Sequence, residues 1–513
     1  MDLPPWIADA PFKFGKVLVA NRGEIACRII RGCQEMGLAT VAIYNDADAN
    51  AMHVELADES VYLEGDDLAS TYLSANSIIN ACRTSRADAL HPGYGFLSER
   101  ADFAELVEAS GIIWIGPPAK AIDSMGDKVK ARRLMLDAGV PLVPGAELTT
   151  QDSLADTVDE LRRLSSEVGF PILLKASAGG GGKGMRSVET SGELEAAFLS
   201  AKREALSAFG DDTIYLERRI VSPRHIEIQI LCDTHGDAIH LLERECSIQR
   251  RHQKVIEEAP SVALSQEMRE QMGEAAINAA KAVHYVGAGT IEFLLSGDEF
   301  FFLEMNTRLQ VEHPVTELVT GVDLVQEQLR IAAGHPLAIS QDEVFPRGWA
   351  IEARIYSEDA ANGFLPSIGP IAVFRPPVGP GIRLDTGVRQ GDEASIDFDP
   401  LLAKLIVHAP DRQRAIERMS RALEDFIILG VTTNIEFLRS VITHEKFASG
   451  DTTTDFIESI WEDGWQSSGD PAAAVIAAAS AEKVGLHLGV SSGETEDSPD
   501  PYNPFSTLGR RYP

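Results

Sequence analysis

Polar and apolar positions alternate with unusual regularity between Glu304 and Glu312. In an extended chain successive side chains point to opposite faces, so the polar side chains at every second position would share one face. The residues on that predicted face are Glu304, Asn306, Arg308, Gln310 and Glu312. Such a strand would span roughly 26 Å, too far for both of its carboxylates to bind one ion. We therefore expect a metal-binding end at Glu304 and Asn306 and a reaction end formed by the three later polar residues, with a solvated edge strand as the alternative.

Two strand-like runs precede this stretch and meet around Gly297. A three-residue hairpin loop at 297–299 would place Glu292 directly opposite Glu304. Facing carboxylates repel each other and destabilise a hairpin unless a cation lies between them. Oxygen ligands from Glu292, Glu304 and Asn306 suit Mg²⁺ or Mn²⁺, whose coordination substrate phosphates usually complete. The alternative is two charged residues on an exposed hairpin.

An apolar run at 170–176, with Lys175 near its end, leads to four consecutive glycines at 179–182. Backbone N–H groups of such glycines can surround an anion, and nearby lysines add positive charge. The run lacks the Lys-Ser/Thr helix start of a Walker phosphate loop, and residues 185–188 read as a strand. The pattern therefore favours a glycine-rich hairpin lying over a triphosphate. A flexible linker is the alternative, but linkers do not follow a buried strand.

The chain is acidic, with 46 Lys and Arg residues against 78 Asp and Glu residues and a formal net charge of −32. This charge argues against nucleic acid or an anionic membrane as a partner. Four potential cations nevertheless lie within 250–254, counting His252. The usual interpretation of such a run is a solvated surface. A basic pocket for phosphate and a small anion is the functional alternative, because so acidic a protein needs a local basic cluster to bind anions.

Strand-like and helix-like patterns alternate in the first part of the chain and predict an open α/β domain. The predicted strands are 16–20, 39–44 and 112–115, and the predicted helices are 25–36, 75–85 and 102–110, with a further helix at 128–138. The expected divisions are the α/β domain at 1–116, a connector at 117–146, a small lid containing the glycines at 147–219, a mixed domain built on antiparallel strands at 220–465, and a partly disordered tail at 466–513.

Apolar runs stay well short of the roughly 20 residues that span a membrane. The N-terminal residues show neither a signal core nor an arginine-rich transit character. The five cysteines are scattered without metal-binding spacing. These features predict a reduced cytoplasmic protein with no disulfide framework and no membrane partner.

Five motifs occur in the order typical of one enzyme family. They lie at 19–26, 91–99, 175–186, 250–255 and 304–314. From about residue 14 to about residue 460, the chain resembles the biotin carboxylase subunits of acetyl-CoA and other acyl-CoA carboxylases, which are members of the ATP-grasp superfamily. The resemblance implies a multidomain α/β and α+β ATP-grasp fold, with an N-terminal Rossmann-like open α/β domain, a small mobile lid domain and a C-terminal mixed domain.

The resemblance also implies a role for each residue of the site. ATP would contact Lys128, Lys175, Gly181, Gly182, Glu217, Arg218, Arg219, Ile220, His225, Gln249, His252, Glu292 and Glu304. Mg²⁺ or Mn²⁺ would bind Glu292, Glu304 and Asn306, and bicarbonate would bind Lys254, Arg308, Gln310 and Val311. The catalytic residues would be Lys254, Arg308, Glu312 as the general base and Arg354 as the stabiliser of the biotin enolate. Biotin would contact Arg354 and Asp399, although Asp399 could equally cap a turn.

The implied reaction is ATP-dependent carboxylation of biotin by bicarbonate through carboxyphosphate, the first half-reaction of an acyl-CoA carboxylase, with acetyl-CoA and fatty acid biosynthesis as the expected setting. No Met-Lys-Met biotin attachment motif occurs in the sequence, so we expect biotin on a separate chain. Expected partners are that biotin carboxyl carrier protein, carboxyltransferase subunits and a second copy of this chain. The alternatives are the biotin carboxylase subunit of a two-chain pyruvate carboxylase, another ATP-grasp ligase and a catalytically silent scaffold. Segment 504–513, which resembles acyl-CoA carboxylase α chains, disfavours pyruvate.

Overall fold

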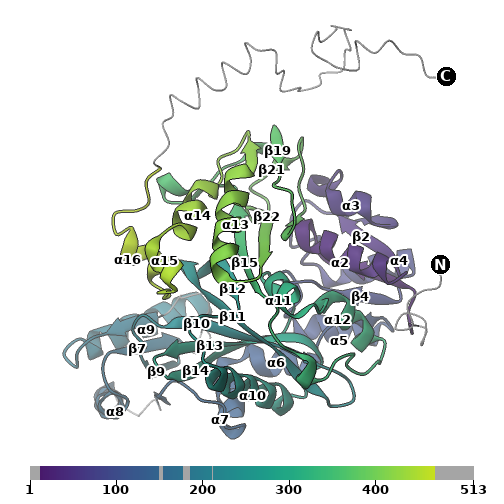
Figure 1. Cartoon of the computed structure of the whole chain (residues 1–513). Helices are drawn as coiled ribbons and strands as arrows, with labels where there is room; N and C mark the ends of the chain where they lie inside the picture. Colours follow the sequence, from purple (N-terminus) through teal and green to yellow (C-terminus); the bar gives the residue numbers. More distant parts are fainter. Residues whose placement is uncertain (1–11, 149–153, 177–184, 211, 468–513) are drawn as a thin grey trace, which may run out of the picture. The chain divides into compact units, whose positions relative to one another are not determined.

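The computed structural model describes residues 12–148, 154–176, 185–210 and 212–467 (Figure 1). Its N-terminal part contains a parallel sheet with the strand order β3-β2-β1-β4-β5. The strands are β1 (Lys16–Val19), β2 (Ala39–Tyr44), β3 (Glu59–Tyr62), β4 (Ala89–His91) and β5 (Ile113–Trp114), and the helices are α2 (Gly23–Glu35), α3 (Met52–Leu56), α4 (Ala75–Ser85) and α5 (Ala101–Ala109). This order extends in both directions from β1 and matches the first five strands of the classic Rossmann order, so the predicted open α/β architecture is confirmed.

Short elements account for what the sequence pattern does not predict in this part. Strand β3 is mostly exposed and polar, and β4 has three residues, so neither shows a clear strand period. Helix α6 (Ala119–Gly126) follows β5 and precedes α7 (Lys128–Asp137), the connector helix that the pattern does predict. Within the described residues, no helix combines the length and the apolar composition needed to cross a bilayer.

A second sheet carries the segment around the glycine run. Its order is β6-β9-β7-β8, formed by β6 (Gly145–Glu147), β7 (Ile172–Ala176), β8 (Met185–Val188) and β9 (Ile214–Arg218), with α8 (Leu154–Val168) and α9 (Leu194–Phe209) beside it. Strands β7 and β8 pair in antiparallel fashion, with Lys175 opposite Met185, as the hairpin prediction requires. The glycine run between them, including Gly181 and Gly182, lies outside the described residues, as does the tail after residue 467.

The largest sheet is antiparallel throughout and positions most of the candidate site. Its order is β14-β13-β10-β11-β12-β15-β22-β20. The strands are β10 (Arg224–Cys232), β11 (Ala238–Arg250), β12 (Gln253–Ala259), β13 (Gly287–Ser296), β14 (Glu299–Asn306), β15 (Trp349–Tyr356), β20 (Ile382–Thr386) and β22 (Leu401–Ala409). Buried apolar side chains on β10 and β13 pack against α10 (Gln266–Ala282), and those on β15 and β22 pack against α13 (Arg412–Asp425). The sheet is therefore supported by one helix near each of its two edges, which fixes the positions of the residues on it.

Smaller elements complete the described chain. They are α11 (His313–Thr320), α12 (Leu324–Ala332), α14 (Ile435–Ile442), α15 (Glu445–Ser449), α16 (Phe456–Ile460), β16 (Glu358–Asp359), β17 (Leu365–Pro366), β18 (Gly369–Pro370), β19 (Val373–Arg375), β21 (Glu393–Ala394) and β23 (Ile427–Leu429). Helix α11 packs on β11, β12, β15 and β22, so the residues at its start face the middle of the large sheet.

The hairpin of β13 and β14 has the predicted facing pair but not the predicted loop. Ser296 pairs with Glu299, which leaves a two-residue loop at 297–298 instead of three residues. The register then shifts between Phe302 and Glu304 at a bulge, and Glu292 lies directly opposite Glu304. A bulge places one extra residue on one strand, and this extra residue offsets the shorter loop.

The prediction of one extended polar face from Glu304 to Glu312 is wrong. Strand β14 ends at Asn306, the chain then turns, and α11 begins at His313 with Glu312 as its N-cap. Pro314 lies in the first turn of that helix, where its fixed φ favours a helix start and its missing N–H costs nothing. The two ends of the polar row are therefore not separated by the length of a strand.

Candidate active site

A row of charged residues crosses the large sheet on neighbouring strands. Glu227 on β10 lies opposite Arg244 on β11 and opposite Glu292 on β13, which in turn lies opposite Glu304 on β14. Glu227 and Arg244 are fully buried, Glu292 is buried, and Glu304 is exposed at the end of the row. Adjacent carboxylates in register repel each other, so the row needs cations to be stable.

Lys254 on β12 supplies one of these cations. Its Nζ donates to Glu227 at 2.5 Å, to Glu292 at 2.8 Å and to Glu312 at 2.6 Å. Burial opposes the charge on this amine, but the three carboxylates outweigh burial and hold its pKa well above the ordinary value. Lys254 therefore joins the predicted metal end to the predicted reaction end, which the sequence interpretation treats as separate.

Glu292 accepts hydrogen bonds from several of the predicted site residues. Asn306 Nδ2 donates at 2.8 Å and Gln310 Nε2 donates at 3.1 Å to the oxygen that also contacts Lys254. His225 Nε2 lies 3.0 Å from the other oxygen, and Gln249 Nε2 lies 2.8 Å from His225 Nδ1. Burial raises the pKa of Glu292, but Lys254 and then His225 lower it well below the ordinary value. This carboxyl group is therefore ionised.

The donor atoms around Glu292 fit a hard divalent cation. Side-chain ligand atoms of His225, Glu227 and Glu292 lie within 4.8 Å of one another, and Glu304 faces Glu292 from the next strand. Carboxylate and amide oxygens are the ligands that Mg²⁺ and Mn²⁺ prefer. Arg244 pairs with Glu227, and Lys254 contacts both Glu227 and Glu292, so the row has two cations against three carboxylates, an excess of negative charge that favours a bound cation.

Glu312 is fully buried at the start of α11. It accepts a hydrogen bond from Lys254 at 2.6 Å and, through its other oxygen, from Arg354 Nη2 at 3.0 Å. Burial raises its pKa, but Lys254, Arg354 and Arg244 together hold the pKa well below the ordinary value. In this arrangement Glu312 is a weak base, so any base function requires the cations to turn toward a bound anion.

Arg354 is buried on β15 and is held from two sides. Its Nε donates to Glu257 Oε1 on β12 at 2.6 Å, and its Nη2 donates to Glu312. Arg308, by contrast, lies in the turn after β14, where its Nε is 3.0 Å from Glu99 Oε2 and its Nη2 donates to Asn306 Oδ1 at 3.0 Å. Both guanidinium groups line a cavity of about 550 Å³ together with Val311, Tyr94 and Asp399.

Asp399 forms the turn contact that is one of its two predicted roles, and its contact with biotin stays a prediction. It lines the cavity shared with Arg308 and Arg354, and its Oδ1 accepts a hydrogen bond from the backbone N–H of Leu401 at 2.9 Å. The second contact shapes the turn that leads into β22.

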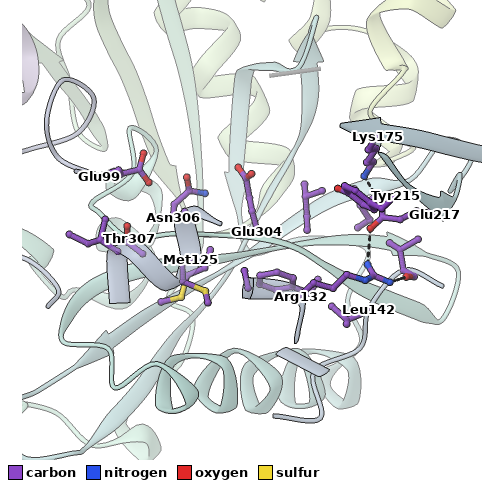
Figure 2. Close-up of a pocket in the computed structure, with 18 of the residues that line it drawn as sticks. Glu99, Met125, Arg132, Leu142, Lys175, Tyr215, Glu217, Glu304, Asn306 and Thr307 are labelled. Atoms are coloured by element: carbon purple, nitrogen blue, oxygen red, sulfur yellow. Dashed lines mark hydrogen bonds and ion pairs between the residues drawn. The ribbon is translucent and has the colours of Figure 1, made fainter. Parts of the chain in front are cut away.

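A second cavity, of about 320 Å³, lies between the small sheet and the hairpin of β13 and β14 (Figure 2). Lys175 Nζ contacts Glu217 Oε2 at 2.5 Å, and Arg132 Nη1 contacts Glu217 Oε1 at 2.7 Å. Glu304 and Asn306 line the same cavity. Apolar side chains of Met125, Leu142 and Phe302 add a hydrophobic wall suited to an aromatic ring.

Several other predicted nucleotide contacts are not among the described residues that line this cavity. Arg218 forms an ion pair with Glu299 at 3.7 Å, and Arg219 forms one with Glu189 at 2.8 Å. Ile220 is partly exposed after β9, and His252 is exposed at the turn between β11 and β12. Lys128 begins α7, and its side chain lies outside the described part of the chain. The two interpretations of the run at 250–254 apply to different residues. Lys254 lies in the site, as the basic-pocket interpretation expects, and Arg251 and His252 lie at the surface, as the solvated-run interpretation expects.

The sequence interpretation misses two buried carboxylates, Glu227 and Glu257. The sequence does mark Glu227, because His225, Glu227 and Gln229 alternate with isoleucines along β10, the same period that singles out Glu304. Glu257 lies in a short strand where acidic and apolar residues are adjacent, so no period marks it. Glu99 lies within the motif at 91–99, but only the fold brings it to Arg308.

Three protein-family descriptions match the chain in order. They are "Biotin carboxylase, N-terminal domain" at residues 13–122, "Carbamoyl-phosphate synthase L chain, ATP binding domain" at residues 127–340 and "Biotin carboxylase C-terminal domain" at residues 352–459. Together they cover most of the sequence and include the strands of the large sheet, apart from the first three residues of β15.

Curated relatives and solved structures agree with this match. A propionyl-CoA carboxylase alpha chain from Ruegeria pomeroyi is 50% identical over 474 residues, covering 88% of this chain and 69% of the relative. A mitochondrial methylcrotonoyl-CoA carboxylase subunit alpha from Arabidopsis thaliana is 49% identical over 465 residues, covering 90% of this chain and 63% of the relative. The chain thus spans about two thirds of the length of these relatives. The biotin carboxylase domain dimer of Hydrogenobacter thermophilus 2-oxoglutarate carboxylase, solved with MgADP, ADP and bicarbonate, has a TM-score of 0.82 at 47% identity and covers 88% of this chain and 98% of that one.

Proposed function

Because the chain belongs to the biotin carboxylase family, we propose that it uses MgATP and bicarbonate to carboxylate carrier-bound biotin as the first half-reaction of an acyl-CoA carboxylase. The relatives name propionyl-CoA and methylcrotonoyl-CoA carboxylases. We therefore favour one of these acyl-CoA acceptors over acetyl-CoA, and the expected link to fatty acid biosynthesis has no support among these relatives.

ATP would occupy the cavity between the small sheet and the β13–β14 hairpin. Its phosphates would lie toward Lys175 and the Gly181–Gly182 segment, with Lys128, His225, Gln249 and His252 as the further predicted contacts. Glu292, Glu304 and Asn306 would hold Mg²⁺, which neutralises charge between the phosphates when it is bound. The cross-strand pairing of Glu292 with Glu304 supports this part of the proposal.

Bicarbonate would bind beside Lys254, with Arg308, Gln310 and the backbone of Val311 around it. Lys254 and Arg308 are committed to carboxylates in this structure. When a bound anion takes hydrogen bonds from these cations, they stabilise ionised Glu312 less, so the pKa of Glu312 rises toward the range of a useful base. Glu312 then takes the proton of bicarbonate as the anion attacks the γ-phosphate.

Arg354 would face biotin across the larger cavity. Its planar guanidinium group is always charged and offers a fork that suits an enolate oxygen. Glu257 holds the Nε side of the guanidinium, which leaves the remaining N–H groups for Glu312 and the substrate. Asp399 lines the same cavity and is the second proposed biotin contact.

The observation that carries this proposal is that Lys254 contacts both Glu292 and Glu312. A ligase that only activates a carboxylate with ATP needs the nucleotide and metal residues, but not the adjoining Arg308, Glu312 and Arg354. The test is phosphate release from MgATP by the purified chain with free biotin. We expect release that depends on both bicarbonate and biotin. Release driven by an amine or carboxylate acceptor in the absence of biotin would instead establish the other ATP-grasp ligase, and no release at all would favour the silent scaffold.

The proposed partners are a biotin carboxyl carrier protein, carboxyltransferase subunits and a second copy of this chain. The Hydrogenobacter thermophilus domain is described as a dimer, which supports self-association. Cytoplasmic localisation stays a prediction from the sequence, since one of the relatives is named as mitochondrial. Co-purification of the native complex, followed by identification of its carboxyltransferase, would decide between propionyl-CoA, methylcrotonoyl-CoA and pyruvate as the final acceptor.

A further inference from the structure

Glu352 lies on β15 two residues before Arg354, on the same face of the strand, and is fully buried. Within the described part of the chain, neither of its carboxyl oxygens has a hydrogen-bond partner. Glu352 lies directly opposite Glu257 on β12, which is also fully buried and whose Oε2 likewise has no partner there. Directly opposed residues of antiparallel strands have Cβ atoms about 4.5–5.5 Å apart. Two carboxyl groups with unpartnered oxygens therefore face each other.

The cations near this pair are already neutralised by other carboxylates. The charged and titratable groups that face Glu352 are Glu257 from β12, Arg354 from β15, Lys404 from β22, Glu312 at the start of α11 and Tyr94 from the loop after β4. Arg354 donates to both Glu257 and Glu312. Lys404 forms ion pairs with Glu24 at 3.2 Å and with Asp385 at 3.8 Å. A negative charge on Glu352 would have no cation of its own, and an unpaired buried charge is strongly unfavourable.

We propose that Glu352 holds a proton in the active enzyme and donates it as a hydrogen bond to Glu257, so that the pair carries one negative charge and fixes the orientation of Arg354. Glu352 is then a positioning residue at the end of a chain of contacts. It orients Glu257, which orients the Nε side of Arg354, which in turn contacts Glu312. The proposal deepens the proposed function and rests on it for the role of Arg354.

The titration of the pair follows from the same contacts. Burial raises the pKa of Glu352 well above its ordinary value of 4.5, and burial also raises the pKa of Glu257 to about 7. Because the folded protein holds the proton of Glu352 at a pH where the unfolded chain has released it, stability falls as the pH rises from the ordinary value toward the folded pKa. Above that folded pKa, a second negative charge beside Glu257 repels it, and Arg354 loses its fixed partner.

Melting temperatures test the proton without using activity. Glu352→Gln carries no charge at any pH, and its amide can donate to Glu257 as the protonated acid does. We expect the melting temperature of Glu352→Gln, relative to wild type, to rise steadily between about pH 6 and pH 9. A relative melting temperature that stays constant or falls over this range, or a variant that does not fold, would show that the ionised carboxylate is needed and would overturn the proposal.

The pH profile of biotin carboxylation tests the positioning role. Glu352→Gln should move the alkaline limb of kcat upward by about one pH unit or more, because its pair with Glu257 cannot gain a second charge. Glu352→Leu removes the donor, and we expect a loss of kcat of ~10-fold with the KM for ATP changed less than ~2-fold, as for a lost hydrogen bond to a charged group. The glutamine variant should restore most of that loss, which a purely structural role would not predict.

Glu327 provides the matched control. It is a buried glutamate on α12, one of its oxygens has no hydrogen-bond partner among the described residues, and burial raises its pKa too. Glu327→Gln should shift melting with pH in the same sense but leave the alkaline limb of kcat in its wild-type position. An identical limb in wild type and Glu352→Gln, or equal losses in the leucine and glutamine variants, would overturn the positioning role. The melting result still decides where the proton lies if the chain carboxylates no biotin.

Discussion

Lys254→Met tests whether one cation stabilises the carboxylates of the site. The ammonium group lies 2.5 Å from Glu227, 2.8 Å from Glu292 and 2.6 Å from Glu312. Methionine keeps most of the apolar stem but removes the charge, so these buried carboxylates lose their shared partner. Removing one partner of a buried ion pair costs about 3–5 kcal/mol, and we expect a loss of at least this size near neutral pH.

The loss should depend on pH in a defined direction. In the wild type, burial opposes ionisation of Glu292, but Lys254 and His225 hold its pKa well below the ordinary value of 4.5. This carboxylate therefore contributes stability above that ordinary value, and the contribution is lost as the pH falls through the lower, folded pKa. Without Lys254, burial dominates and raises the pKa, so the variant loses stability as the pH rises. The gap between wild type and variant should be widest near pH 8 and should narrow toward about pH 5.

Melting temperatures of both proteins across this pH range provide the assay. Lys130→Met is the matched control, because Lys130 pairs with Asp123 at 2.6 Å on an exposed surface, where an ion pair contributes about 0–1 kcal/mol. The control variant should melt near the wild-type temperature at every pH. A Lys254→Met protein as stable as wild type near pH 8, or a deficit that does not change with pH, would refute the reasoning.

Three further substitutions test the other proposed roles. Glu304→Gln should raise the Mg²⁺ concentration needed for ATP cleavage by at least ~10-fold without unfolding the protein. The control variant Glu299→Gln, on the same hairpin, should leave that concentration unchanged. Unchanged Mg²⁺ dependence in both Glu304→Gln and Glu292→Gln would remove the metal assignment. Glu312→Gln should bind ATP normally yet carboxylate biotin at least ~10²-fold more slowly, the lower end expected for loss of a general base, and a fully active or merely unfolded variant would contradict this. Arg308→Lys should also lose carboxylation, because an ammonium group cannot reproduce the planar fork, and a kcat near wild type would argue against that role.

Local patterns predicted the fold class and the facing pair of the β13–β14 hairpin. The β-α-β alternation at the start of the chain comes from buried strands and amphipathic helices that are each specified locally, so the parallel sheet was predictable. The pairing of Glu292 with Glu304 was also predictable, because the strands of a hairpin are adjacent in the chain. The two-residue loop and the bulge that together produce this register were not, since the hydrophobic pattern alone does not locate a bulge.

Contacts between distant segments explain what the sequence could not show. The alternation from Glu304 to Glu312 mimics a strand, but Pro314 and the start of α11 turn the chain and bring Glu312 back to Lys254. Arg354 meets Glu257 only because β15 and β12 are neighbours in the large sheet. Buried carboxylates such as these are stable only with such partners, so their roles become visible when the sheet order is known.

The most direct test of the central claim follows the oxygen atoms of bicarbonate. The purified chain is supplied with MgATP, free biotin and ¹⁸O-labelled bicarbonate, and the phosphate released is analysed by mass spectrometry. If bicarbonate attacks the γ-phosphate with Glu312 as the base, each phosphate released together with carboxybiotin should carry one labelled oxygen, and Glu312→Gln should release far less of it. Unlabelled phosphate, which keeps three oxygens from ATP and takes its fourth from water, would contradict the account if it formed at the same rate with or without biotin.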